Sequence, residues 1–275
     1  MFSLRNMESI KELRQILQEQ KVNPVGWKRP WGYKLFQRGP SIYITRLLIP
    51  TRVTPTQITV AGFFIGLAGA MLLSHVEWNI KLVGLLLLYL HILSDKVDGE
   101  LARYRKNYSL RGIFWDEINH LIIPPLAWIS LAFGVIPYSA SEAWVLIAGI
   151  TGALTLAFLR VIHSLPAQIY AKKYLKYREH FALSVTNDEG PSQHESTLRL
   201  AASTLHLFQD FFIIIATLAL IILAERIYFP DYMFHPILWR AMIILSALWT
   251  LFVIENIIKK SSTIEQDIGH IASST

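Results

Sequence analysis

The chain of 275 residues is 53% hydrophobic and only 17% charged, which is more apolar than ordinary soluble domains and predicts a membrane protein. It contains no cysteine, which excludes disulfide bonds, thiol chemistry and zinc sites built from cysteine. The net charge of +6 is expected to set membrane topology and to contact lipid headgroups, so we expect no nucleic-acid partner.

The first 56 residues are polar and basic and contain one amphipathic pattern. Ile10, Leu13 and Leu17 recur at helical spacing among charged residues, which predicts a helix with one apolar face. One interpretation places this helix in the interface at the cytoplasmic membrane surface. The other is a solvated helix that packs against loops of the same protein. Residues 1–56 are thus predicted to form a cytoplasmic, interfacial segment.

Six apolar windows follow, each long enough to cross about 30 Å of hydrocarbon as a helix. They predict an all-α integral membrane protein, with a six-transmembrane-helix bundle over residues 57–258 and a cytoplasmic tail over residues 259–275. The predicted spans cover approximately residues 57–75, 80–101, 112–134, 142–163, 205–229 and 236–258.

Lysine and arginine residues gather in the N-terminal segment, in the second and fourth loops between spans, and in the tail. This distribution predicts that both termini are cytoplasmic. In the first span, the small residues Gly62, Gly66 and Ala70 recur at every fourth position. Such a stripe predicts close helix packing, either within the bundle or between the two copies of a homodimer.

Residues 94–120 interrupt the second and third spans with charged side chains. Asp95 and Asp98 share one helix face, and Asp116 and His120 share another. Two helices joined by a short loop are expected to be antiparallel neighbours, which brings these faces together near the cytoplasmic ends of the spans. Three carboxylates at membrane depth would repel one another, so we expect a functional site that holds a divalent cation.

Carboxylate oxygens favour Mg²⁺ or Mn²⁺ over zinc or copper, and such ions commonly hold a substrate phosphate. The neighbouring residues suit such a substrate. Gly99 and Gly112 would let a bulky group approach the backbone. Ala102 also leaves room, and Arg103 offers a planar fork to phosphate oxygens. Close helix packing would explain the small residues but not the carboxylates.

One run of residues matches a family signature. The run Asp95-x2-Asp98-Gly99-x2-Ala102-Arg103-x8-Gly112-x3-Asp116 resembles the signature of the CDP-alcohol phosphotransferases, also called CDP-alcohol phosphatidyltransferases. The predicted six spans, the helix before them and the stretch VTPTQIT at residues 53–59 are also similar to that family. The resemblance covers most of residues 40–258.

The resemblance implies a phospholipid-synthesising enzyme that uses divalent metal to bind the diphosphate of a CDP-linked donor. An acceptor hydroxyl would attack the phosphorus beyond the cytidine-linked one, releasing CMP. Carried over by position, the metal ligands would be Asp95, Asp98 and Asp116, and Asp116 would also be catalytic. The residues that would shape the CDP and phosphate pocket are Gly99, Ala102, Arg103 and Gly112.

Family frequency and the six-span size imply CDP-diacylglycerol as donor, with membrane lipid among the partners and a small alcohol as acceptor. The sequence VDGELAR at residues 97–103 is also similar to that of family members that act on soluble CDP-linked polyols, so a soluble CDP-linked polyol is the alternative donor. Arg160 is a candidate anchor for an anionic group on the acceptor. Eukaryotic choline and ethanolamine members of the family are longer, which also favours CDP-diacylglycerol. We expect a multi-pass protein of a prokaryotic cell (inner) membrane, with its active site facing the cytoplasm.

Two positions depart from the family pattern. The signature ends with a further aspartate where this chain has His120, and the family usually has asparagine where this chain has Thr56. A neutral imidazole has a pKa of about 6.5 in model peptides and accepts a proton more readily than an ionised aspartate, so His120 is predicted to be the general base.

The missing aspartate also allows another hypothesis, a catalytically silent relative that binds nucleotide or lipid. A third hypothesis is a cation or proton transporter. Such a protein should connect acidic groups near the bilayer midplane to the far side of the membrane. The outer halves of the predicted spans are almost purely apolar, which speaks against it.

Overall fold

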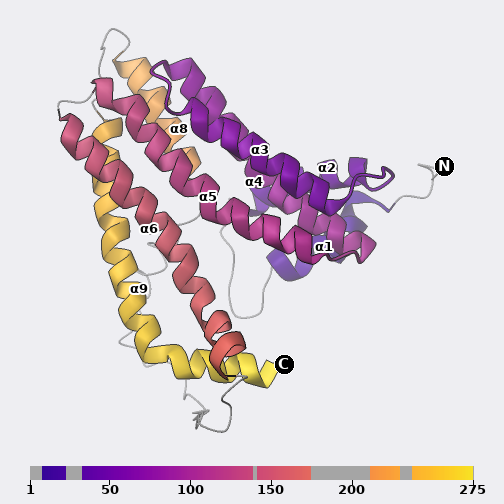
Figure 1. Ribbon diagram of the computed structural model, residues 1–275. Coiled ribbons are helices and arrows are strands. Elements are labelled where there is room, and N and C mark those ends of the chain that lie inside the picture. Colours follow the sequence, from indigo (N-terminus) through magenta and orange to yellow (C-terminus); the bar gives the residue numbers. More distant parts are fainter. Residues whose placement is uncertain (1–7, 23–32, 139–140, 175–210, 230–236, 275) are drawn as a thin grey trace, which may run out of the picture. The chain divides into compact units, whose positions relative to one another are not determined.

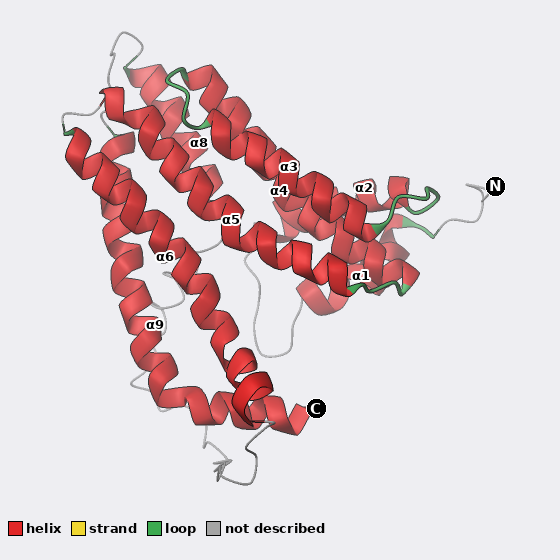
Figure 2. Ribbon diagram, viewed as in Figure 1, coloured by secondary structure: helices red, strands yellow, loops and turns green. Residues whose placement is uncertain are grey.

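The computed structural model describes residues 8–22, 33–138, 141–174, 211–229 and 237–274. Within these ranges the regular elements are all helices, and no strand occurs (Figure 1, Figure 2). The predicted all-α class is therefore confirmed for this part of the chain.

The described part of every predicted span falls largely on a helix. The helices are α1 (Ile10–Val22), η2 (Tyr33–Arg38), α2 (Gly39–Leu48), α3 (Pro55–Leu72), α4 (Trp78–Arg105), α5 (Leu110–Val135), η3 (Ile136–Tyr138), α6 (Glu142–Ile169), η4 (Tyr170–Tyr174), α8 (Phe211–Tyr228) and α9 (Leu238–Ser274). Residues 205–210 of the fifth predicted span lie outside the described residues. Helix α9 continues beyond residue 258, so the predicted tail is largely an extension of the last helix.

Five helices have the length and apolar composition needed to cross a membrane, namely α3, α5, α6, α8 and α9. This number indicates a multi-pass membrane protein. Helix α4 has 28 residues but is not among the five, and its C-terminal part carries the charged residues that interrupt the second predicted span. A bundle of six spans therefore stays a prediction.

The structure consists of two compact units, Met1–Ile123 and Pro124–Thr275. The first unit contains helices α1 to α4 and the N-terminal part of α5. Helix α5 continues into the second unit, and Pro124 and Pro125 lie at the boundary inside this helix. All of the predicted metal ligands belong to the first unit.

Helices α3 and α4 lie side by side in the first unit (Figure 1). Small residues of α3 face α4. A methyl group added at Gly62 would collide with Ser94, and one added at Gly66 would lie 2.9 Å from the ring of His91. The predicted small-residue stripe therefore serves packing within the bundle. It gives no separate support to a homodimer, which stays a prediction.

We expect Gly69→Ala to destabilise the protein by about 1–3 kcal/mol. The added carbon would lie 2.8 Å from the carbonyl oxygen of Gly84 and 2.9 Å from the amide nitrogen of Leu88, and these backbone atoms cannot rotate away. Thermal unfolding in detergent micelles measures the loss. Gly39→Ala is the control, because its nearest contact would be an ordinary 3.4 Å. Equal losses in the two variants would contradict the packing argument.

Helix α1 packs against the protein itself. Its residues Leu13 and Leu17 form a buried cluster with Ile42 of α2, and Tyr104 of α4 packs against that cluster. The apolar face predicted from the sequence is thus covered by the chain's own residues, although these belong to helices α2 and α4 and not to the loops that the second interpretation expected. A position of this segment at the membrane surface stays a prediction.

The second unit is built on helices α6 and α9. Leu159 and Ile162 of α6 form a buried cluster with Phe252 and Val253 of α9. Glu225, fully buried near the end of α8, accepts hydrogen bonds from two backbone amides at the start of α9, at 2.6 Å from N of Ile237, just before the helix, and 2.7 Å from N of Leu238, its first residue. These amides have no partner within their own helix, so the buried carboxylate has a structural role as a helix cap.

Candidate metal and phosphate site

Helices α4 and α5 carry the predicted metal ligands and are joined by a short loop, residues 106–109. Lys106 ends α4 in the left-handed conformation, with φ of 51°. The amide of Asn107 closes the helix end by donating to the carbonyl of Ala102 at 3.0 Å. Asp95 and His120 lie at equal sequence distances from this loop, so the turn brings them to the same level.

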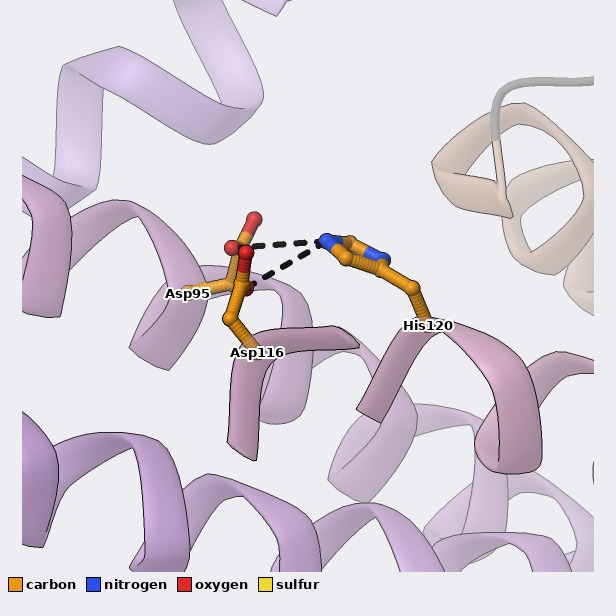
Figure 3. A group of neighbouring side chains, drawn as sticks. All are labelled: Asp95, Asp116 and His120. Carbon is orange, nitrogen blue, oxygen red and sulfur yellow. Dashed lines mark ion pairs between the residues drawn. The ribbon is translucent and has the colours of Figure 1, made fainter. Parts of the chain in front are cut away.

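Asp95, Asp116 and His120 point toward one another (Figure 3). His120 Nε2 lies 3.8 Å from Asp95 Oδ1 and 3.5 Å from Asp116 Oδ1. One ligand atom from each residue lies within 4.8 Å of the other two, and all three residues are half-buried. Two carboxylates and one imidazole on this scale fit a single divalent ion, and an imidazole ligand is compatible with Mn²⁺.

Asp98 is held on the side of helix α3. Its Oδ2 accepts a hydrogen bond of 2.6 Å from Thr59 Oγ1, and Asn119 Nδ2 donates to the Thr59 carbonyl at 3.3 Å. Among the described residues, Asp98 is not part of the three-residue group. The structure therefore brings together two of the three predicted carboxylates with His120 and ties the third to the start of α3.

Lys96 is a residue of this site that the sequence analysis did not single out. Its ammonium group forms an ion pair with Asp95, and both side chains are less than one-fifth exposed. The three aspartates and this lysine together leave two net negative charges near the site. A lysine inside a predicted span was the signal available in the sequence, because such charges seldom occur there without a function.

Arg103 lies alongside Gly99, and the absence of a side chain at Gly99 leaves room for the guanidinium of Arg103. A carbon added at Gly99 would lie 3.3 Å from Arg103 Nη1. Arg103 Nε donates to the carbonyl of Leu17 at 3.0 Å, while its Nη2 is buried without a hydrogen-bond partner among the described residues. An unpaired buried guanidinium nitrogen is costly and suits an anionic ligand.

Gly112 lies beside a groove of about 720 Å³. A carbon added at Gly112 would lie 3.0 Å from Ser109 Oγ and 3.2 Å from Thr56 Oγ1, and these two hydroxyls are 2.9 Å apart. The groove is lined by Thr54, Pro55, Thr56, Gln57, Val60, Ala61, Asn107, Ser109 and Arg111. The loop after α4 and the first turns of α3 thus form one concave surface next to a predicted pocket residue.

For the remaining two predicted site residues, Ala102 and Arg160, the structure gives the helix and the burial. Ala102 is half-buried on α4, one position before Arg103. Arg160 is half-buried in α6, in the second unit, so its role as an acceptor anchor stays a prediction.

Comparison with protein families gives one match. The model of the CDP-alcohol phosphatidyltransferase family matches residues 52–245, which is more than half of the chain. The match includes every predicted site residue from Asp95 to Arg160 and begins just before the VTPTQIT stretch. No curated protein matches the chain.

Proposed function

The chain belongs to the CDP-alcohol phosphatidyltransferase family, and from this premise we propose that it transfers a substituted phosphate from a CDP-linked donor to an alcohol, releasing CMP. Membership of this family supports a transferase. The observation that carries the proposal is the convergence of Asp95, Asp116 and His120 in a half-buried site. About two helical turns beyond Asp95 on α4, Arg103 offers a buried guanidinium nitrogen without a hydrogen-bond partner among the described residues.

The donor set fits Mg²⁺ or Mn²⁺ held by Asp95 and Asp116, with Asp98 close by in the next helical turn. When bound, such an ion neutralises negative charge on the donor diphosphate and lowers the cost of charge in the transition state. Thr59 orients Asp98 through its hydrogen bond, which gives a physical reason for the last threonine of VTPTQIT.

In the proposed reaction, the acceptor oxygen forms a bond to the phosphorus that carries the transferred group. The bond between that phosphorus and the CMP oxygen breaks, and CMP leaves with the electron pair. His120 is proposed to take the proton from the acceptor hydroxyl. Its side chain is 38% exposed, which leaves it accessible to an acceptor.

The donor would lie over the segment from Gly99 to Gly112. Arg103 Nη2 would bind a phosphate oxygen, and the groove beside Gly112 would accept the nucleotide. The small side chain of Ala102 would leave room at the same helix end. Arg160 is proposed to bind an anionic group on the acceptor.

The proposed donor is CDP-diacylglycerol, and a soluble CDP-linked polyol is the alternative. The proposed arrangement is a six-span domain over residues 57–258 in a prokaryotic cell membrane. Both termini and the active site would face the cytoplasm, because lysine and arginine gather on that side. The product would then be a phospholipid or, with the alternative donor, a polyol phosphodiester.

A catalytically silent nucleotide- or lipid-binding protein is the second candidate. Two observations favour it: His120 replaces a family aspartate, and Lys96 already neutralises one of the remaining carboxylates. A transporter has less support. Buried Lys81 at the opposite end of α4 donates to two backbone carbonyls, of His75 at 2.6 Å and Val76 at 2.8 Å, which gives this charge a structural role.

Release of CMP by the purified full-length protein tests the proposal. We expect acceptor-dependent release with Mg²⁺ or Mn²⁺ that stops on chelation with EDTA and returns when the ion is restored. Parallel reactions with CDP-diacylglycerol and with a soluble CDP-polyol, each with pooled polyols, amino alcohols and polyol phosphates, identify the donor. Binding of CDP without any CMP release in either reaction would contradict the transferase and support the silent candidate.

A further inference from the structure

Glu100 is a fully buried carboxylate within the segment that carries the pocket residues. It follows Gly99 directly, lies one helical turn before Arg103, and occupies a position that the family signature leaves unspecified. Burying a carboxylate costs several kcal/mol unless charged and hydrogen-bonded partners compensate. Its partners therefore indicate why this position holds a charge.

Within the part of the chain that the structure describes, its four hydrogen-bond donors all come from the N-terminal segment formed by α1, η2 and α2. Oε1 accepts from Arg38 Nη1 at 2.9 Å, from Gln18 Nε2 at 2.8 Å and from Ser41 Oγ at 2.8 Å. Oε2 accepts from Thr45 Oγ1 at 2.7 Å. The Arg38 side chain is only 7% exposed, so this is a buried ion pair between the N-terminal segment and α4.

The same N-terminal segment holds Arg103. The carbonyl of Leu17 accepts the hydrogen bond from Arg103 Nε, which orients the guanidinium and leaves Nη2 without a partner. Glu100 attracts the charge of Arg103, whereas Arg38 repels it. Glu100 thus offsets the repulsion between the two guanidinium groups, and among the described residues Arg38 is the one of the two that donates a hydrogen bond to it. The neighbouring residues Leu17 and Gln18 of α1 bind Arg103 and Glu100, which are three residues apart on α4.

We propose that Glu100 is a positioning residue through which the N-terminal segment aligns Arg103 with a phosphate group of the CDP-linked donor. The donor itself rests on the proposed function. On this basis α1 and α2 are part of the donor site, although all of α1 and α2 precede the residues matched by the family. The alternative is that this cluster only stabilises the fold.

The variant Glu100→Gln in the full-length protein distinguishes the positioning role from a purely structural role. Without the carboxylate charge, Arg38 and Arg103 repel each other with no compensating charge, so Arg103 should move away from its position. We expect the affinity for CDP in the presence of Mg²⁺, measured by calorimetry, to fall by about tenfold, the change produced by loss of one charge-assisted interaction. Mn²⁺ binding should not change, because the metal ligands keep their charges.

Two further variants distinguish positioning from stability. Ser41→Ala removes the hydrogen bonds of one hydroxyl, with Glu100, Arg38 and Gln18, but no charge, so it should lower the unfolding temperature with little effect on CDP affinity. The double variant Arg38→Gln with Glu100→Gln removes both charges together, and it should bind CDP more tightly than Glu100→Gln alone. This recovery is expected because the repulsion acting on Arg103 is also gone.

A different pattern would overturn the proposal. If Glu100→Gln lowers only the unfolding temperature and leaves CDP affinity unchanged, Glu100 serves the fold alone and the positioning role is wrong. The same conclusion follows if the double variant binds CDP no better than the single one. Failure of the native chain to bind CDP would overturn both this proposal and the proposed function. The two outcomes above would overturn the positioning role alone, so failure of this proposal is distinguishable from failure of the proposed function.

Discussion

Asp116→Asn is expected to lower acceptor-dependent CMP release by about 10²- to 10³-fold, the effect of losing transition-state charge stabilisation of several kcal/mol. Asp95 is already paired with Lys96, and Asp98 is bound by Thr59. Asp116 is the second carboxylate of the group that it forms with Asp95 and His120, and it is proposed to hold the metal ion together with Asp95. Its loss should weaken Mn²⁺ binding together with the reaction rate.

The matched control is Glu117→Gln, which removes the same charge one residue further along α5. Glu117 is exposed and lies about 100° around the helix from Asp116, away from the site. Steady-state CMP release and Mn²⁺ titration on both variants measure the difference. Equal rates for Asp116→Asn and the native chain would remove Asp116 from the proposed metal site.

His120→Asp is expected to raise the number of Mn²⁺ ions bound per chain from one to two. In the native chain, three carboxylates and one ammonium leave two net negative charges, which match one divalent ion. A fourth carboxylate at position 120 would lie beside Asp95 and Asp116 and bring the formal charge of these groups to −3, which a single divalent ion no longer neutralises and which favours a second ion. Electron paramagnetic resonance of free Mn²⁺ during titration counts the bound ions.

His120→Asn controls for the shape of the side chain, because it has the size of aspartate without the charge. It should bind one ion, as the native chain does. One ion in His120→Asp as well would show that charge at this position does not set the number of metals. The rates of CMP release answer a separate question. If His120→Asp releases CMP and the native chain does not, the native site is catalytically silent.

The helices were predictable because their signal is local. Long apolar windows and the spacing of small residues depend on neighbours along the chain, and the described part of every predicted span falls largely on a helix. The end of the last helix was not predictable in the same way. Its polar extension beyond residue 258 has no apolar window, yet it continues as α9 to Ser274.

The site was predicted in part for the same reason. Asp116 and His120 are four residues apart, so helix geometry alone places them together, and the short loop brings Asp95 near them. The partners of Asp98 and Glu100 were not predictable. Thr59 and Gln18 lie far from them in the sequence, and no periodic pattern relates residues on different helices.

The sequence by itself therefore determined the helical class, the apolar spans, the family and the candidate metal ligands, because these follow from composition and from spacing within single helices. Only the tertiary structure decided which carboxylates converge, that Lys96 neutralises one of them, and that the N-terminal segment holds Glu100 and Arg103. The physical reason is that charge compensation acts through space over a few ångströms, so it depends on which helices pack together.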